Sequence, residues 1–440
     1  MGKPIRVLPL FALPMVVSVI FQQLYNIADN IIAGQFLGED ALAAVSISYP
    51  VTMIYMAIAI GINAGASVVI SQLFGAAQYH RMKTAISTAV IATVVTAAVL
   101  TAAGIAFLQP ILHLLQTPQS IFTDTWRYLV IYTAGLMFIF LYNICTGVFT
   151  AIGDSVTPLV FLIISSVGNV FLDVAFVSWL HMGVAGCAWA TFVCQGAAAV
   201  GAYLVLRRKL RKLEGVREKW FSRAMLHTVS RLAVPSILQQ SFVSVGNLFV
   251  QYIVNGYELT SIIGGYGAAV KLNTFMVSIL TTLSTAVSGY TAQNIGGGKR
   301  ERVPQGLRTA YLLCVILSLP VAVLYFFFGD IPMRLFAEND SAGVLQVGQE
   351  FLRTVAPFYV VVALKVVCDG VLRGAGVVRQ FTTTTFTDLI LRVALAFVLP
   401  HWFGYTGIWM AWPIGWTVST ALSYFYYRGG KWKTADILHS

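Results

Sequence analysis

The stretch TAISTAVIATVVTAAVLTAAGIAFLQ, residues 84–109, contains no charged side chain and is long enough to cross a lipid bilayer as one α-helix. A helix needs about 20 apolar residues to span ~30 Å of hydrocarbon. Similar runs recur through the chain of 440 residues, of which 58% are hydrophobic and 10% charged. Since soluble chains carry about 25% charged residues, the composition excludes water-soluble enzymes, secreted disulfide scaffolds and nucleic-acid-binding domains.

The apolar runs predict an all-α polytopic membrane protein with 12 transmembrane helices. A membrane β-barrel would instead show segments of about 10 residues with alternating polarity. The predicted spans are residues 8–32, 46–72, 84–109, 128–150, 158–179, 184–206, 231–255, 263–290, 307–328, 351–372, 382–400 and 405–427.

Basic residues fix the expected orientation of these spans. If both termini are cytoplasmic, the cytoplasmic loops and tails hold 22 Lys and Arg residues, whereas the outer loops hold only Arg127, Arg334 and Arg353. Loops rich in Lys and Arg stay on the cytoplasmic side, so we expect a multi-pass protein of the plasma (inner) membrane with both ends inside. The net charge of +11 then reflects topology and contact with anionic membrane lipid, and no nucleic-acid partner is expected.

The two halves of the chain repeat each other. At an offset of 221 residues, Gly183-Val-Ala-Gly186 matches Gly404-Tyr-Thr-Gly407, and at an offset of 223, Gly153 matches Gly376. Six spans per half place both halves in the membrane in the same sense, a parallel repeat found in secondary transporters. The predicted organisation is an N-terminal lobe (1–206), a basic cytoplasmic linker (207–230) and a C-terminal lobe (231–440).

Ionisable groups within the spans of the first half are candidate functional residues, because charges are costly at bilayer depth. Tyr25 and Asp29 share a helix face at i, i+4, as do Asn169 and Asp173. Asn143 and Thr191 add further oxygen ligands. Together these six residues would suit a hard cation, with Na⁺ held at Asp29, Asn169 and Asp173, or a shared proton on the carboxylates.

The second half differs because its intramembrane charges come in pairs of opposite sign. Lys365 and Asp369 stand at i, i+4, and so do Asp388 and Arg392. These spacings predict two structural ion pairs, which confines cation coupling to the first half.

A lipophilic substrate cavity is a further hypothesis. Aromatic rings attract organic cations and thioethers adapt to varied shapes, which points to Tyr49, Met53, Met56 and Met276. The alternative is that these side chains face lipid or pack between helices. No nucleophile–base constellation or cofactor motif occurs, so we expect no enzymatic activity, no cofactor beyond the coupling ion and no obligatory protein partner.

Several motifs resemble those of the multidrug and toxic compound extrusion (MATE) family along essentially the whole chain. They are Gln22-Gln-Leu-Tyr-Asn-Ile-Ala-Asp29 with Gly34 and Gly38 after it, Gln72-Leu-Phe-Gly75, Gln293-Asn-Ile-Gly296, and Gly370-Val-Leu-Arg-Gly374. The resemblance implies two six-helix lobes in a V shape that export small compounds, often organic cations, by antiport with H⁺ or Na⁺.

Within that family the chain is most similar to the DinF-like type, which carries acids on helices 1 and 5 of the first lobe. Asp29 and Asp173 match those acids, and the accompanying polar positions are matched by Tyr25, Asn143, Asn169 and Thr191. Another branch places coupling acids on helices 7 and 10, but helix 7 here offers only Gln239 and Gln240. Two alternatives stand beside an efflux antiporter: a flippase for an anionic lipid-linked precursor, and a non-transporting membrane receptor or scaffold.

Overall fold

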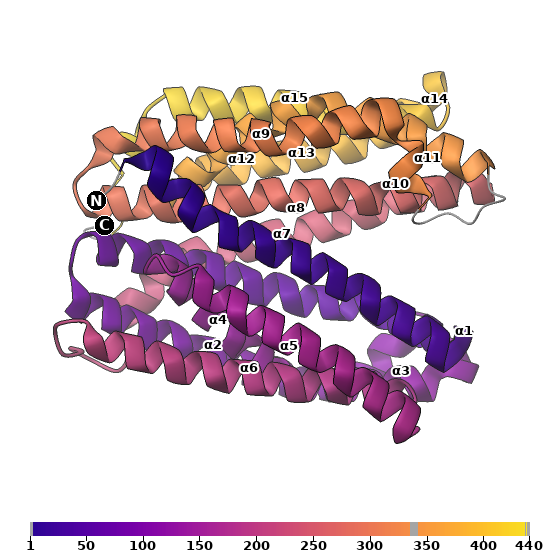
Figure 1. Ribbon diagram of the computed structural model, residues 1–440, viewed down its shortest axis with the longest axis horizontal. Helices are drawn as coiled ribbons and strands as arrows, with labels where there is room; N and C mark the ends of the chain where they lie inside the picture. Colours follow the sequence, from indigo (N-terminus) through magenta and orange to yellow (C-terminus); the bar gives the residue numbers. More distant parts are fainter. Residues whose placement is uncertain (1–2, 335–341, 436, 438–440) are drawn as a thin grey trace. The chain divides into compact units, whose positions relative to one another are not determined.

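The computed structural model describes residues 3–334, 342–435 and 437, with the side chains of residues 26–42 excepted. Within the described residues every regular element is helical. The chain divides into two compact units, one formed by residues 17–238 and the other by residues 1–16 together with 239–440. Figure 1 shows the elements of both units along the chain.

The first unit is built from six helical segments. They are α1 (Pro4–Gly75, beyond its first turns), α2 (Tyr79–Leu114), α3 (Gln119–Ala134), α4 (Leu136–Ala151), α5 (Val156–Val174) with the π-helix η1 (Ala175–Trp179), and α6 (Val184–Lys212). The helix α7 (Arg223–Asn255) begins in this unit and continues in the second. Its start leaves residues 213–222 as the connection from α6.

The second unit contains the remaining helices. They are α8 (Thr260–Gly296), η2 (Arg300–Arg302), α9 (Val303–Phe328), α10 (Asp330–Met333), α11 (Ala342–Val355), η3 (Ala356–Phe358), α12 (Tyr359–Gly374), α13 (Val378–Val398), α14 (Pro400–Phe403), α15 (Thr406–Arg428) and η4 (Lys431–Lys433). The start of α1 and the end of α15 lie at the same end of this unit (Figure 1).

The observed helices match the predicted spans with three differences. The first two predicted spans both lie within α1, as the candidate spans Pro4–Tyr25 and Ala43–Gly75. The fourth is bent by 46° where α3 meets α4, beside Gly135. Ten described helices are long and apolar enough to cross a membrane, or eleven with that bent pair. The twelfth predicted span, α15, falls outside this set because its Trp, Gly, Ser and Thr residues lower its hydropathy.

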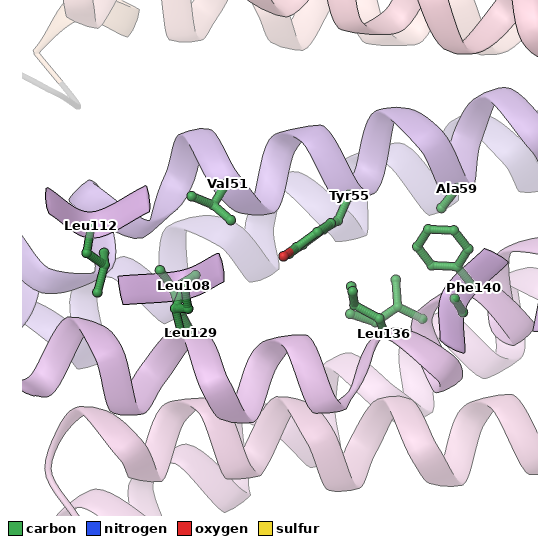
Figure 2. Packing of buried hydrophobic residues seen from close by; sticks show 10 residues of the cluster. Val51, Tyr55, Ala59, Leu108, Leu112, Leu129, Leu136 and Phe140 are labelled. Carbon is green, nitrogen blue, oxygen red and sulfur yellow. The ribbon is translucent and has the colours of Figure 1, made fainter. Parts of the chain in front are cut away.

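An apolar core joins α1, α2, α3 and α4 in the first unit. Figure 2 shows Val51, Tyr55 and Ala59 on one helix turned towards leucines of the neighbouring helices. Leu108, Leu112, Leu129 and Leu136 in this cluster are fully buried. These contacts hold the α1 segment after residue 43 against α2 and α3. Helix α6 packs against α3 and α4, and α5 packs against α6.

In the second unit α12 packs closely against α8. A Cβ added to Gly370 would lie 2.6 Å from the backbone oxygen of Ser284, and one added to Gly374 would overlap the backbone of Ser288. Small residues four apart allow two helix backbones to approach this closely. The motif Gly370-Val-Leu-Arg-Gly374 is therefore explained by helix packing.

Candidate cation site

Helix α5 has an apolar exterior and a polar interior. Its buried residues are Ser166, Asn169 and Asp173, whereas Ile164 and Phe171 are 64% and 71% exposed. A soluble helix has the opposite arrangement, because its apolar stripe faces the core. Ionisable residues that face the inside of a membrane bundle are candidate functional residues, and Asn169 and Asp173 both lie on this inner face.

Asn169 connects the members of this site by hydrogen bonds. With its amide nitrogen turned to the carboxylate, Nδ2 donates to Asp173 Oδ2 at 2.9 Å and to Tyr25 Oη at 2.6 Å, and Oδ1 accepts from the Thr191 backbone N–H at 3.1 Å. The opposite orientation would set a carbonyl oxygen against a carboxylate oxygen. Helices α1, α5 and α6 thus meet at one amide.

Asp173 is completely buried, with 0% of its surface exposed, and Asn169 is 3% exposed. Taking a carboxylate out of water is costly unless a proton, a cation or hydrogen-bond donors stabilise it. The neutral amide of Asn169 supplies one such donor without cancelling the charge. The oxygens of Asp173, Asn169 and Tyr25 therefore form a set that suits a proton or a hard cation such as Na⁺.

The structure places the other predicted members of the site differently. Asn143 donates from Nδ2 to the backbone oxygen of Ile139 on its own helix at 2.9 Å. Thr191 contributes its backbone N–H to the cluster, not the hydroxyl that the sequence suggested. The side chain of Asp29 lies outside the described residues.

A π-helix, η1, begins two residues after Asp173, at the end of α5, and it was not predicted from the sequence. It runs from Ala175 to Trp179. Such π segments are rare and occur frequently at functional sites. Apolar composition could not locate it, because an inserted residue leaves the span apolar. The one trace in the sequence is the change of the repeat offset from 223 at Gly153 to 221 at Gly183.

Lys365 and Asp369 form the ion pair that their spacing predicts. Lys365 Nζ lies 2.9 Å from Asp369 Oδ2, and both side chains are almost fully buried. Thr384 and Ser423 donate to Asp369 Oδ1 at 2.9 and 2.7 Å. Both carboxylate oxygens are thus hydrogen-bonded, and the pair joins α12 to α13 and α15.

Asp388 and Arg392 do not form the predicted ion pair. The guanidinium of Arg392 instead lies over the ring of Trp412, 4.2 Å from its centroid. Asp388 Oδ1 makes no hydrogen bond and lies against Gly415, 2.9 Å from where a Cβ would stand. The prediction from i, i+4 spacing was wrong because an aromatic ring on α15 stacks against the guanidinium.

The four residues proposed to line a substrate cavity differ in exposure. Tyr49 is 58% exposed, and Met53 and Met56 are partly buried. Met56 packs against the apolar cluster of Figure 2. Met276 is fully buried, so in this structure it packs in the core of the second unit and does not line an open cavity.

Together the helices and the buried polar cluster define a class: a polytopic membrane protein with ionisable residues inside a helical unit. Comparison with known proteins supports this class. The family model MatE matches residues 14–175 and 235–398, and the chain belongs to this family of multidrug efflux transporters.

Individual relatives agree with the family assignment. The probable multidrug resistance protein YpnP of Bacillus subtilis is 29% identical over 439 residues, which cover 99% of this chain and 97% of that protein. Two solved structures share the fold. An outward-facing multidrug resistance MATE family transporter of the MOP superfamily has a TM-score of 0.91 at 22% identity, covering 98% of this chain and 97% of that one. A MOP superfamily transporter from Pyrococcus furiosus also scores 0.91 at 21% identity, covering 97% and 96%.

Proposed function

We propose that this protein exports small organic compounds, chiefly lipophilic cations, in exchange for H⁺ or Na⁺ that binds in the first unit. The observation that carries the proposal is the pair Asp173 and Asn169, buried on the inner face of α5, with the partly buried Tyr25 of α1 hydrogen-bonded to Asn169. The family supports export of drugs, and the cluster supports cation coupling.

Export of the substrate is coupled to entry of the cation because the two ligands prefer different states of the protein. A ligand shifts a two-state equilibrium only by the difference between its affinities for the two states. We propose that a cation at Asp173, together with Asp29, stabilises one state of the first unit and the substrate stabilises the other. Because α1 supplies Tyr25 to the cluster, movement of α1 is the step that cation occupancy controls.

Location and orientation follow from the same proposal. The protein resides in the plasma membrane with both termini cytoplasmic and contacts anionic lipid through its basic loops. The support is the excess of Lys and Arg in the cytoplasmic loops and the common end at which α1 begins and α15 ends (Figure 1). Its partners are the substrate and membrane lipid.

A flippase would use the three basic residues within the spans of the second half, Lys271, Lys365 and Arg392, to hold an anionic headgroup. Two of the three have other partners. Lys365 is neutralised by Asp369 at 2.9 Å, and Arg392 stacks on Trp412. These contacts leave neither Lys365 nor Arg392 as an open anion site, and together with the family this favours the efflux antiporter.

Replacement of the acids by their amides tests the proposal in cells. Asp173→Asn and Asp29→Asn remove a negative charge with little change in volume, and each is expected to lower drug efflux at least tenfold at normal expression. Asp124→Asn is the matched control, because Asp124 is an exposed acid on α3. Wild-type efflux by both Asp173→Asn and Asp29→Asn would contradict the proposal.

A further inference from the structure

The internal repeat can be aligned residue by residue between α5 and α13. Gly153 and Gly376, which precede these helices, both have positive φ, at 86° and 75°, and they set an offset of 223. At this offset the three buried residues of α5 correspond to buried residues of α13. The matched pairs are Ser166 with Leu389, Asn169 with Arg392, and Asp173 with Ala396.

The next helices, α6 and α15, align at an offset of 221. Gly183 and Gly404, which precede them, both have φ of 59°, and buried residues again coincide along the two helices. From Gly153 to Gly183 the first unit has two more residues than the second unit has from Gly376 to Gly404. The π-helix η1 lies in this interval of the first unit. Thr191 is therefore matched by Trp412.

The repeat thus relates the cation site of the first unit to Arg392 in the second. Asn169, which bonds Asp173 and the Thr191 backbone, becomes Arg392, which lies 4.2 Å from the ring centroid of Trp412. The acid is replaced by the fully buried Ala396. One unit offers a carboxylate to a solution cation, and the other carries a covalently attached cation at the corresponding place.

Arg392 is held without a carboxylate partner within ion-pair distance among the described residues. It is 6% exposed and its Nε makes no hydrogen bond. A buried, unpaired charge is costly, although the face of a Trp ring stabilises a cation. Asp388, one turn earlier on α13, leaves Oδ1 without a hydrogen bond.

We infer that Arg392 is a resident substitute for the coupling cation in the second unit. The inference rests on the proposed cation site at Asp173. The guanidinium permanently occupies the position that the coupling cation would take in the second unit. The second unit therefore stays in one state, and only the first unit responds to the ion gradient. Removal of the guanidinium charge opens a position beside Asp388 and Trp412 to a small monovalent cation.

Thermal unfolding of the purified protein tests this inference. Melting temperatures are compared in sodium chloride and choline chloride, and across a pH series in choline, for wild type, Asp173→Asn, Asp173→Asn/Arg392→Gln and Asp173→Asn/Arg392→Lys. For wild type we expect the cation to raise Tm, and for Asp173→Asn we expect no such rise. Among the double variants, we expect the rise in Tm to return only in Asp173→Asn/Arg392→Gln. The Lys double variant is the matched control, because it keeps the attached charge.

The outcomes separate the two proposals. A wild-type protein without a cation response would refute the cation site itself, and this inference with it. A wild-type response with no return in a folded Gln double variant would refute the role of Arg392 alone. If the Gln variant does not fold, the single variant Arg392→Lys decides: ion-driven export at the wild-type level supports a role of charge, and loss of export from folded protein overturns it.

Discussion

Buried polar residues of this protein are best understood one at a time, because each has a different partner. Asp173 faces a neutral amide, Asp369 faces a lysine and two hydroxyls, and Arg392 faces a tryptophan ring. From i, i+4 spacing, the sequence alone could predict that Asn169 and Asp173 share one face of their helix. The same spacing predicted the ion pair between Lys365 and Asp369. It could not predict the partner of Arg392, because Trp412 is brought to it only by packing of α15.

Replacement of Asn169 by Ala is a prediction at the residue scale. It removes the donor to Asp173 and the links to Tyr25 and Thr191, while the acid stays in place. Groups that orient ion ligands typically contribute 10–100-fold in affinity, so we expect the cation concentration for half-maximal export to rise about tenfold or more. The measurement is the cation dependence of export. Ala at Asn143, which bonds only its own helix in the described contacts, is the control, and an equal effect at both positions would contradict the assignment.

The helices depend on a few close contacts that hydropathy does not reveal. The apolar runs of the sequence located the described spans, α15 included, yet they gave no sign of the bend between α3 and α4, of the π-helix after Asp173, or of the proximity of α12 to α8. Each of these features arises from backbone geometry and from contacts between helices. A sequence read one span at a time lacks that information.

Gly370→Ala tests the close packing of α12 against α8. Its methyl group would lie 2.6 Å from the Ser284 backbone oxygen, so a helix must shift, and overpacking of this kind costs about 1–3 kcal/mol. Gly267→Ala on α8 is the control, because nothing lies within 4 Å of the added Cβ and Ala favours a helix by up to about 1 kcal/mol. We expect a lower Tm for Gly370→Ala and an unchanged or higher Tm for Gly267→Ala. Equal stability of the two variants would refute the packing argument.

A loop ion pair connects the turn after α4 to the end of α6. Lys209 donates to the carboxylate of Asp154, which also accepts from the Thr157 backbone N–H at 3.0 Å. Burial alone would raise the pKa of Asp154, but hydrogen bonds from Lys209 and Thr157 and the charge of Lys209 outweigh it and lower the pKa below its ordinary value. The ionised form is therefore favoured in the folded protein.

Because the pKa of Asp154 is lowered on folding, its contribution to stability is present at neutral pH and is lost as the pH falls through the lowered value. Asp154→Asn should cost about 0.2–1 kcal/mol at pH 7, the usual range for a partly exposed pair. The difference in Tm between wild type and variant should narrow towards acid pH. A gap that widens on acidification would show that the carboxylate does not stabilise the folded form.

At the scale of the whole molecule, the repeat explains both the likeness and the functional difference of the two units. Composition, charge distribution and the internal repeat were sufficient to predict the helical class, and the family model confirms the family suggested by the motifs. The difference depends on two matched positions, Asn169 with Arg392 and Asp173 with Ala396. The sequence alone did not match these positions, because the match requires the buried residues of α5 and α13, which the structure gives.

We propose that cation entry at Asp173 drives export, and ion-coupled efflux from reconstituted liposomes tests this most directly. A fluorescent lipophilic cation is followed under an imposed Na⁺ gradient at fixed pH, and then under a pH gradient without Na⁺. We expect one of these gradients to drive transport by the wild type, and Asp173→Asn to abolish that transport. Transport by folded Asp173→Asn at the wild-type rate, or no response of folded wild-type protein to either gradient, would contradict it.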